Sequence, residues 1–204
     1  QWYEVVGSRL FVRDEAWTPT IVGEPLATNT GFVRMVEMRD MIVMVDGDSG
    51  YVYNLDTQVF TQITDPDWRG SDWVSTLDGY AIFAAPDTDQ FYISAIDDAS
   101  TLDALDFSSA DKNPDVIVTH RVVGNQLLMM GKRSIELYVN SGEDFPFARY
   151  TSAPIEVGVV GNRAAINASE TLYWVGQTGR GVAYVYELQG HQPVRISTQA
   201  VEES

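Results

Sequence analysis

The sequence predicts an all-β protein of the β-propeller class, either a whole propeller or a propeller fragment, with about five four-stranded antiparallel blade-like repeats. Three observations lead to this prediction. An apolar strand, a tight polar turn, a second apolar strand and an aromatic-rich third strand return about every forty residues. The turns have the composition of β-hairpin turns. No stretch shows a sustained helical period or a membrane-spanning apolar run, so we expect a soluble protein that does not span a membrane.

The elements can be justified in chain order from the turns. Five two-residue turns separate apolar runs, and they are Gly7-Ser8, Arg39-Asp40, Asp78-Gly79, Gly124-Asn125 and Ser169-Glu170. The expected aromatic-type strands are 9–13, 51–55, 91–96, 135–140 and 182–188. The expected fourth strands are 18–22, 58–63, 147–150 and 193–196, with a weaker one at 104–107. Four antiparallel strands per repeat are typical of a propeller blade, in which stacking covers both faces of each sheet.

The repeats are expected to form one propeller domain, and they span roughly 1–30, 31–70, 71–114, 115–157 and 158–204. The first repeat is expected to lack its innermost strand, because the chain opens at Gln1–Val6, already inside a strand. We therefore expect a fragment of a longer protein. The polar and acidic segment Ser197–Ser204 could close a ring by pairing with the first repeat or lead into further blades.

The charge is negative and unevenly distributed. The net charge is −16, and residues 40–115 contain sixteen Asp but only two basic residues, Arg69 and Lys112. Such a surface disfavours a phosphate backbone, because nucleic-acid affinity depends on Lys and Arg. We expect no direct nucleic-acid binding. The Asp residues suit turns and exposed strand faces, and a basic partner surface is the alternative.

Two groups of acidic residues have patterns that also occur in catalytic or metal-binding sites. Some five-bladed propellers are glycosidases that use paired carboxylates, and Asp40, Asp78 and Asp115 lie near the expected inner strands or their turns. Asp is abundant throughout, which weakens this hypothesis. The segment Asp46–Gly50 has the alternating oxygen donors of a calcium loop but lacks the later bidentate Glu, so a plain hairpin loop is favoured.

Other cofactor chemistry has little support. The chain contains no Cys, which excludes disulfides and thiolate metal sites. His120 and His191 are the only histidines, and His120 is expected to pack along an inner strand. No phosphate-binding glycine motif occurs. We expect no cofactor and no metal.

The aromatic residues are expected to fill the wedge-shaped spaces between blades. They include five tryptophans, which are Trp2, Trp17, Trp68, Trp73 and Trp174. A carbohydrate-binding platform would instead require several rings exposed on one face. A carbohydrate- or peptide-binding propeller therefore remains an alternative.

From about residue 91 onward, the chain contains a series of distinctive short motifs in a fixed order. The motif stretches are Phe91–Asp98, Leu105–Ala110, Pro114-Asp115, Gly131–Tyr138, Gly142, Phe145–Arg149, Ile155–Gly158, Leu172–Gly176, Gly181, Val185-Tyr186 and Pro193–Ser197. In this order they resemble the packaged-DNA stabilisation proteins of short-tailed bacteriophages. The resemblance is strong from about residue 80 to residue 197 and thinner before it.

The resemblance implies a structural virion protein of the tail or neck, assembled in the host cytoplasm. Such a protein joins the portal and adaptor rings after DNA packaging, closes the exit channel, and offers attachment points for tailspikes and the tail needle. It also implies a β-propeller body, several copies arranged in a ring, and no enzymatic activity.

Two acidic residues are candidates for polar contacts between blades or with a ring neighbour. Glu136 and Glu156 each lie between two apolar residues of a strand-like run. Alternation along a strand puts each Glu on the opposite face from its neighbours. Contacts between blades are favoured over contacts with a partner. Gly131 and Gly158 are expected to occupy tight backbone positions.

Overall fold

The computed structural model describes residues 1–112, 115–150, 154–168, 170–177 and 182–198. These residues form strands, turns and loops without helices, so the described part of the chain has no helix that could cross a membrane. The predicted turn residue Ser169, the motif residues Pro114 and Gly181, and most of the segment Ser197–Ser204 lie outside the described residues.

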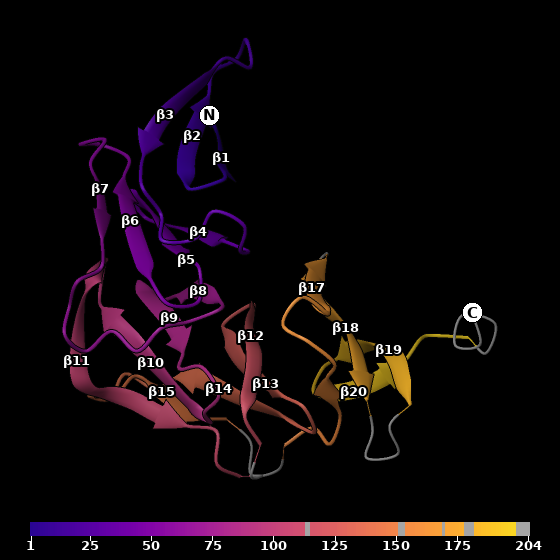
Figure 1. Ribbon diagram of the computed structural model, residues 1–204. Coiled ribbons are helices and arrows are strands. Elements are labelled where there is room, and N and C mark those ends of the chain that lie inside the picture. The colour runs from indigo at the N-terminus through magenta and orange to yellow at the C-terminus, as the bar shows by residue number, and fades with distance from the viewer. Residues whose placement is uncertain (113–114, 151–153, 169, 178–181, 199–204) are drawn as a thin grey trace. The chain divides into compact units, whose positions relative to one another are not determined.

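Five antiparallel sheets follow one another along the chain (Figure 1). Within each sheet, strands that are neighbours in sequence are also hydrogen-bonded neighbours, with one exception described below. This order is an up-and-down meander, which is the blade topology of a propeller. The predicted all-β fold is confirmed.

The first two sheets have the following strands. The first consists of β1 (Trp2–Val6), β2 (Arg9–Arg13) and β3 (Pro19–Gly23). The second consists of β4 (Arg34–Met38), β5 (Met41–Val45), β6 (Gly50–Asn54) and β7 (Phe60–Gln62). Every residue of β5 is buried, because both faces of this central strand are covered.

The third and fourth sheets also have four strands each. The third consists of β8 (Val74–Leu77), β9 (Tyr80–Ala84), β10 (Gln90–Ala95) and β11 (Asp98–Ser109). The fourth consists of β12 (Ile117–Val123), β13 (Gln126–Gly131), β14 (Ile135–Asn140) and β15 (Phe147–Arg149).

The fifth sheet departs from the four-strand pattern. It consists of β16 (Gly158–Val159), β17 (Ala165–Ala168), β18 (Thr171–Gln177), β19 (Ala183–Gln189) and β20 (Gln192–Arg195). Both β16 and β17 pair with β18, at opposite ends of that strand. The two short strands therefore occupy the position of a single first strand that is interrupted by residues 160–164.

The third repeat differs from the prediction in its fourth strand. The expected weak strand at 104–107 is part of the twelve-residue strand β11, and only two residues separate β11 from the end of β10. Asp97 has a φ of 59° and its backbone N–H donates to Gly79 O, so the chain reverses immediately. Of the buried apolar residues in β11, Ala99 is small and Leu102 follows three residues later. The sequence of this strand therefore shows no regular alternation of apolar and polar residues.

The two-residue hairpin turns depend on left-handed backbone conformations. Asp78 has a φ of 52° and Gly79 a φ of 84° between the paired residues Leu77 and Tyr80. Positive φ at both central residues defines the type I′ turn, whose twist matches that of the strands. The turns at Gly7-Ser8, Arg39-Asp40 and Gly124-Asn125 likewise join paired strands.

The chain divides into two compact units, one of residues 1–86 and 92–106, the other of residues 87–91 and 107–204. In the first unit, Met44 and Tyr51 belong to an apolar cluster with Leu10, and Val43 belongs to another with Phe83. In the second unit, apolar side chains of the fourth and fifth sheets form one cluster. Within each unit, neighbouring sheets thus share an apolar core. The expectation of a single domain stays a prediction.

Candidate functional site

Glu136 lies at the centre of a polar network in the second unit. It is on β14 between Ile135 and Leu137, and only 4% of its surface is exposed. Its two neighbours are also buried, so both faces of β14 are covered. An ionised carboxylate in such a place requires a cation and hydrogen-bond donors.

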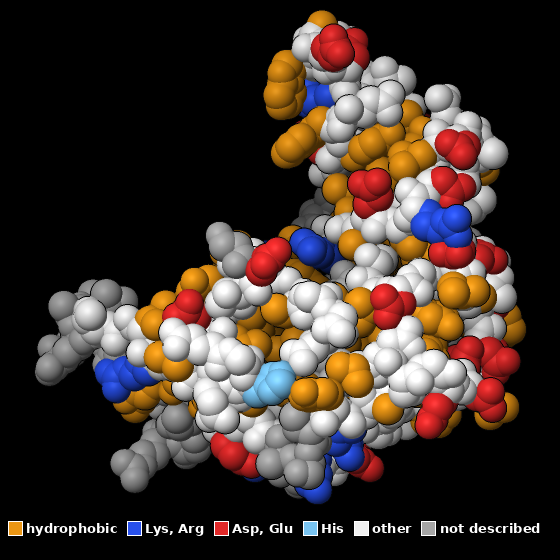
Figure 2. Space-filling model, turned by 180° about the vertical axis from the view of Figure 1, so that it is seen from behind, with side chains coloured by type: hydrophobic (Ala, Val, Ile, Leu, Met, Phe, Trp, Pro, Cys, Tyr) orange, Lys and Arg blue, Asp and Glu red, His pale blue; other side chains and the backbone are white. Residues whose placement is uncertain are grey.

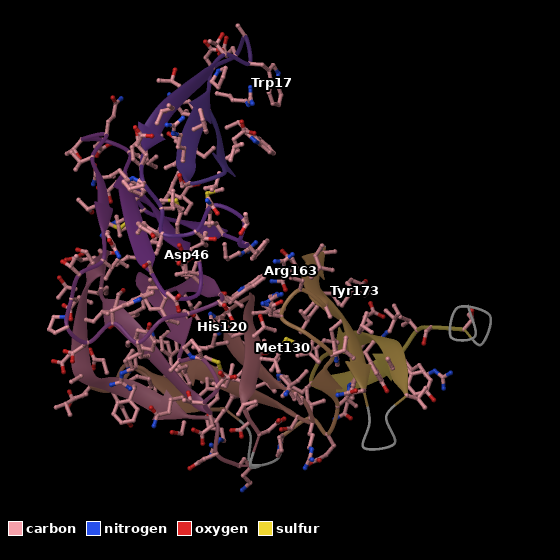
Figure 3. All side chains as sticks on the ribbon, viewed as in Figure 1. Trp17, Asp46, His120, Met130, Arg163 and Tyr173 are labelled. Atoms are coloured by element: carbon pink, nitrogen blue, oxygen red, sulfur yellow. The ribbon has the colours of Figure 1, made fainter. Side chains whose placement is uncertain are left out.

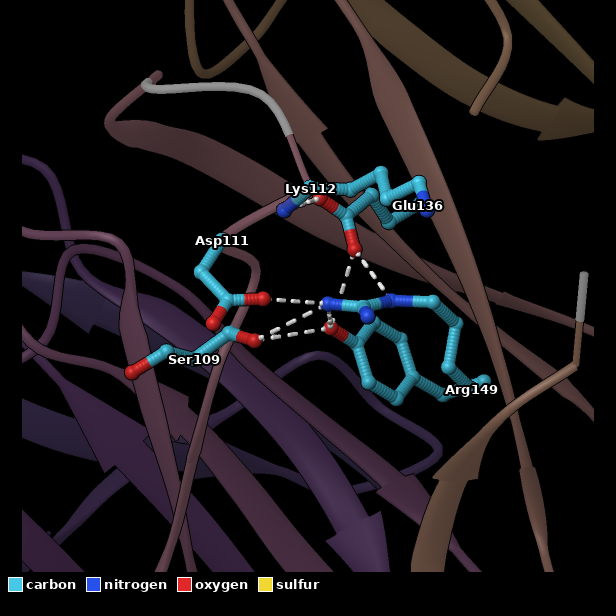
Figure 4. A network of polar contacts seen from close by, with 6 residues as sticks. Ser109, Asp111, Lys112, Glu136 and Arg149 are labelled. Carbon is cyan, nitrogen blue, oxygen red and sulfur yellow. Dashed lines mark hydrogen bonds and ion pairs between the residues drawn. The ribbon is translucent and has the colours of Figure 1, made fainter. Parts of the chain in front are cut away.

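Three donors reach the Glu136 carboxylate (Figure 4). Arg149 Nε on β15 donates to Oε2 at 2.7 Å, and the Tyr138 hydroxyl donates to the same oxygen at 3.2 Å. The backbone N–H of Lys112 donates to Oε1 at 2.9 Å. Both carboxylate oxygens are therefore satisfied, by two donors from the same sheet and one from the segment that follows β11.

Arg149 extends the network toward the surface. Its Nη2 atom donates to Asp111 Oδ1 at 2.7 Å and to the backbone oxygen of Ser109 at 3.4 Å. The Tyr138 hydroxyl is also within 3.1 Å of Ser109 O. The network thus joins the outer strands β14 and β15 to residues 109–112, more than twenty residues earlier in the chain.

The electrostatics of the network follow from burial and these contacts. Burial raises the pKa of the Tyr138 phenol, and the nearby Glu136 carboxylate raises it further. Burial alone would lower the pKa of Arg149, but the contacts with Asp111, Tyr138 and Glu136 raise it overall. The hydrogen bond and charge of Arg149 lower the pKa of Asp111. The single guanidinium of Arg149 thus lies between two carboxylates, and the arrangement stabilises the fold.

A pH prediction follows for Tyr138. Because its pKa is raised above 10.0, its contribution to stability is fully present below that pH and is lost as pH rises through the raised value. We expect the stability difference between wild type and Tyr138→Phe to shrink between about pH 8 and about pH 11. Urea unfolding at the two pH values measures this difference. An unchanged difference would contradict the prediction.

Glu156, the other predicted contact residue, has a different environment from Glu136. It is exposed, whereas Glu136 is buried. Its neighbour Ile155 exchanges two backbone hydrogen bonds with Ile135, each of 2.9 Å. Glu156 lies outside the network, and its contact with a partner stays a prediction.

The three Asp residues considered as glycosidase carboxylates lie in separate turns or loops. Asp40 accepts a hydrogen bond from Asn54 Nδ2 at 3.2 Å. Asp78 occupies the type I′ turn described above. Asp115 accepts backbone hydrogen bonds from Arg133 at 2.6 Å and Ser134 at 3.2 Å. These contacts give Asp40 and Asp115 structural roles, in positioning a turn and a loop.

Asp46 organises the segment that was considered as a calcium loop. Its carboxylate accepts hydrogen bonds from Ser49 N at 2.9 Å, Tyr51 Oη at 3.2 Å and Thr28 N at 3.3 Å. These donors would compete with a cation for the same oxygens. Within the described residues, no group of three or more His, Asp or Glu side chains is arranged to hold a metal ion.

The two histidines lie apart from the network in the sequence and differ in environment. His120 is completely buried on the first strand of the fourth sheet, β12, as predicted (Figure 3). His191 lies within 3.0 Å of Gln126 Nε2 and packs edge-on against Tyr150.

The prediction that all tryptophans fill spaces between blades is wrong for two of them. Trp73 and Trp174 are buried, and Trp68 packs edge-on against Phe83 at 5.1 Å between ring centroids. In contrast, Trp2 is 61% exposed and Trp17 is 63% exposed. Composition alone could not separate the two groups, because exposure depends on which sheets cover each ring.

Sequence reasoning also missed a buried arginine. Arg121 on β12 is 4% exposed and donates to the backbone oxygens of Asn162 and Ala165, each at 2.9 Å. It thereby ties the fourth sheet to the interrupted first strand of the fifth. The only sequence signal was a cation within the apolar run 117–123.

The five meandering sheets, with apolar clusters shared between neighbours, define a β-propeller protein, and the polar network fits a structural member of that class. The chain belongs to the phage-stabilisation family: the family model described as bacteriophage P22 Gp10, β-propeller, matches residues 1–204. Membership of this family makes it a structural protein of bacteriophages. No curated protein sequence matches the chain.

Solved structures with a similar fold come from varied proteins. A putative 6-phosphogluconolactonase from Bacteroides uniformis has a TM-score of 0.63 at 12% identity, with 93% of this chain and 62% of that chain covered. The N-terminal domain of Nup159 has a TM-score of 0.59 at 10% identity, with 96% and 57% covered. PorZ of the type-IX secretion system of Porphyromonas gingivalis has a TM-score of 0.54 at 12% identity, with 95% and 26% covered.

These similarities show the fold alone, since the identities are low. The chain spans less than two thirds of the length of each of these structures.

Proposed function

We propose that this protein is a structural part of the phage neck that closes the portal channel after DNA packaging and serves as an attachment hub for tail components. The observation that carries the proposal is the family match over residues 1–204. In this role the protein contacts the portal and adaptor rings, the tailspikes and the tail needle, and associates with further copies in a ring. It resides in the virion and assembles in the host cytoplasm.

The side-chain chemistry supports a scaffold without enzymatic activity. Among the described residues the most buried carboxylate is that of Glu136, which is held by Arg149, Tyr138 and the Lys112 backbone, so its charge is used to join segments of the fold. A general base needs a carboxylate that can reach a substrate proton. Glu136 is not available for such a step.

The charge distribution supports retention of DNA by steric closure instead of direct binding. Residues 40–115 carry sixteen Asp and two basic residues. Such a surface repels phosphates, and nucleic-acid affinity requires the opposite charge. We therefore propose no direct nucleic-acid contact for this part of the protein.

Deletion of the gene, with complementation in trans, tests the head-closure role. We expect phage lacking the protein to fill their heads and then lose DNA, with particles that lack tailspikes in electron micrographs. Complementation with wild type should restore both DNA retention and infectivity. As a matched control, Ile166→Ser changes a 65% exposed side chain outside the network and should complement like wild type. Stable, DNA-filled and infectious deletion particles would contradict the proposal.

A further inference from the structure

Two exposed tryptophans lie together on the first sheet. Trp2 begins β1, and Trp17 is in the loop between β2 and β3, where it projects from the end of the sheet (Figure 3). Their ring centroids are 6.4 Å apart and the ring planes are tilted by 43°. At this end of the sheet, projecting hydrophobic side chains lie beside acidic and basic ones (Figure 2). Large exposed aromatic side chains in a group are typical of binding surfaces.

Hydrogen bonds hold the backbone of the loop on both sides of Trp17. Its backbone N–H donates to Asp14 O at 3.0 Å, and its own backbone oxygen accepts from Arg13 Nη1 at 2.8 Å. Asp14 Oδ1 accepts from the next backbone N–H, that of Thr18, at 2.8 Å. Trp17 has a φ of 63°, which is unfavourable for a bulky residue and requires such support. The backbone that carries this exposed ring is therefore fixed by the loop's own hydrogen bonds.

An open pocket of about 450 Å³ lies beside the two rings. It is lined by Gln1, Trp2, Arg13, Asp14, Glu15 and Trp17. The charge of Arg13 is already paired, because its Nε lies 2.7 Å from Glu4 Oε1. Among the described residues, no cation forms an ion pair with Asp14 or Glu15. The pocket thus combines two indole rings, two carboxylates that lie outside these ion pairs, and the guanidinium of Arg13, which is paired with Glu4.

Elsewhere the same fold places arginines over aromatic rings. In the pairs named next, guanidinium carbons lie 3.9 to 5.8 Å from ring centroids. These are Arg195 over Tyr184, Arg34 over Trp73, Arg69 over Tyr92 and Arg149 over Tyr138. Indole is the most favourable ring for this interaction. No cation occupies the corresponding position on Trp2 or Trp17 in the described part of the chain.

We infer that this Trp2–Trp17 pocket binds a lysine or arginine side chain in a basic segment of a partner protein. The cation would lie against the indole faces, while Asp14 and Glu15 supply the opposite charge. A protein of net charge −16 also attracts such a segment at long range. The inference rests on this surface alone and does not depend on the head-closure role.

Titration with short peptides tests the pocket directly. The probes are a lysine-rich peptide, an arginine-rich peptide and a glutamate-rich peptide of equal length, monitored by the NMR signals of the Trp2 and Trp17 indole N–H groups. We expect both basic peptides to shift these two signals and the acidic peptide to leave them unchanged. Trp17→Ala and the pair Asp14→Asn with Glu15→Gln should each weaken binding about tenfold or more.

The control variant is Ile166→Ala, which removes an exposed apolar side chain far along the chain and should bind like wild type. Far-ultraviolet circular dichroism of each variant checks that the fold is retained. Failure of both basic peptides to bind would overturn the inference. It would also be overturned if neutral oligosaccharides shifted the two indole signals in place of basic peptides, or if Trp17→Ala abolished self-association while peptides had no effect.

Discussion

Replacing Gly158 with alanine is expected to lower the free energy of unfolding by about 3 kcal/mol or more. Gly158 begins β16, and a methyl group at its Cα would overlap backbone atoms of Lys132 and Arg133. Backbone atoms in the loop between β13 and β14 cannot move aside as a flexible side chain can. The variant must therefore shift β16 away from this loop and disturb the cluster shared by the fourth and fifth sheets. Urea unfolding of the purified variant measures the effect.

Gly161→Ala provides the matched control, because it makes the same chemical change three residues later. A methyl group at Gly161 meets no atom within 4 Å, and its backbone is not left-handed. We expect its stability to stay within about 0.5 kcal/mol of wild type. Equal stabilities for the Gly158 and Gly161 variants would show that the close approach at Gly158 does not constrain the fold.

Replacing Arg149 with methionine is expected to cost about 3 kcal/mol. The change leaves the Glu136 carboxylate, which is 4% exposed, without its cation. The value is at the lower end for breaking a buried ion pair, because the Arg149 side chain is 31% exposed. The same change should raise the pKa of Asp111 toward its ordinary value, since Arg149 is the main cause of its lowering. Denaturant unfolding and NMR titration measure the two effects.

A second substitution separates the cost of an unpaired charge from that of lost packing. In the Arg149→Met background, Glu136→Gln removes the uncompensated charge and should recover part of the lost stability. Arg9→Met is the control for a surface pair, because Arg9 and Glu24 are each about half exposed, and it should cost under about 1 kcal/mol. If Arg149→Met were no more costly than Arg9→Met, the network would not stabilise the fold as described.

The Glu136 network and the Trp2–Trp17 pocket have different consequences for function. The network is internal, so its loss should reduce the amount of folded protein without changing partner choice. The pocket is exposed, so its variants should fold normally and change binding alone. Variants of the two sites therefore distinguish a stability defect from an interaction defect in complementation experiments.

Local features of the sequence were sufficient to predict the fold class and the order of hairpins. Turn residues such as Asp78-Gly79 favour left-handed backbone conformations, and the flanking apolar runs have the length of strands. Both signals depend only on residues that are close together in the sequence. They can therefore be recognised without knowledge of the tertiary structure. The weakest prediction, at 104–107, located the fourth strand of the third sheet but underestimated its length, because acidic residues and small buried side chains masked the rest of β11.

The roles of individual side chains were decided by the tertiary structure. Glu136 and Glu156 share the pattern of an acid between two apolar residues, yet one is buried in an ion-pair network and the other is exposed. The difference arises because residues 109–112 and Arg149 close over Glu136, through contacts between segments distant in sequence. The five tryptophans divide in the same way, into three packed rings and two exposed ones. The sequence by itself determined the repeated antiparallel hairpins, whereas the packing of distant segments determined which acids are paired and which aromatic rings remain available to a partner.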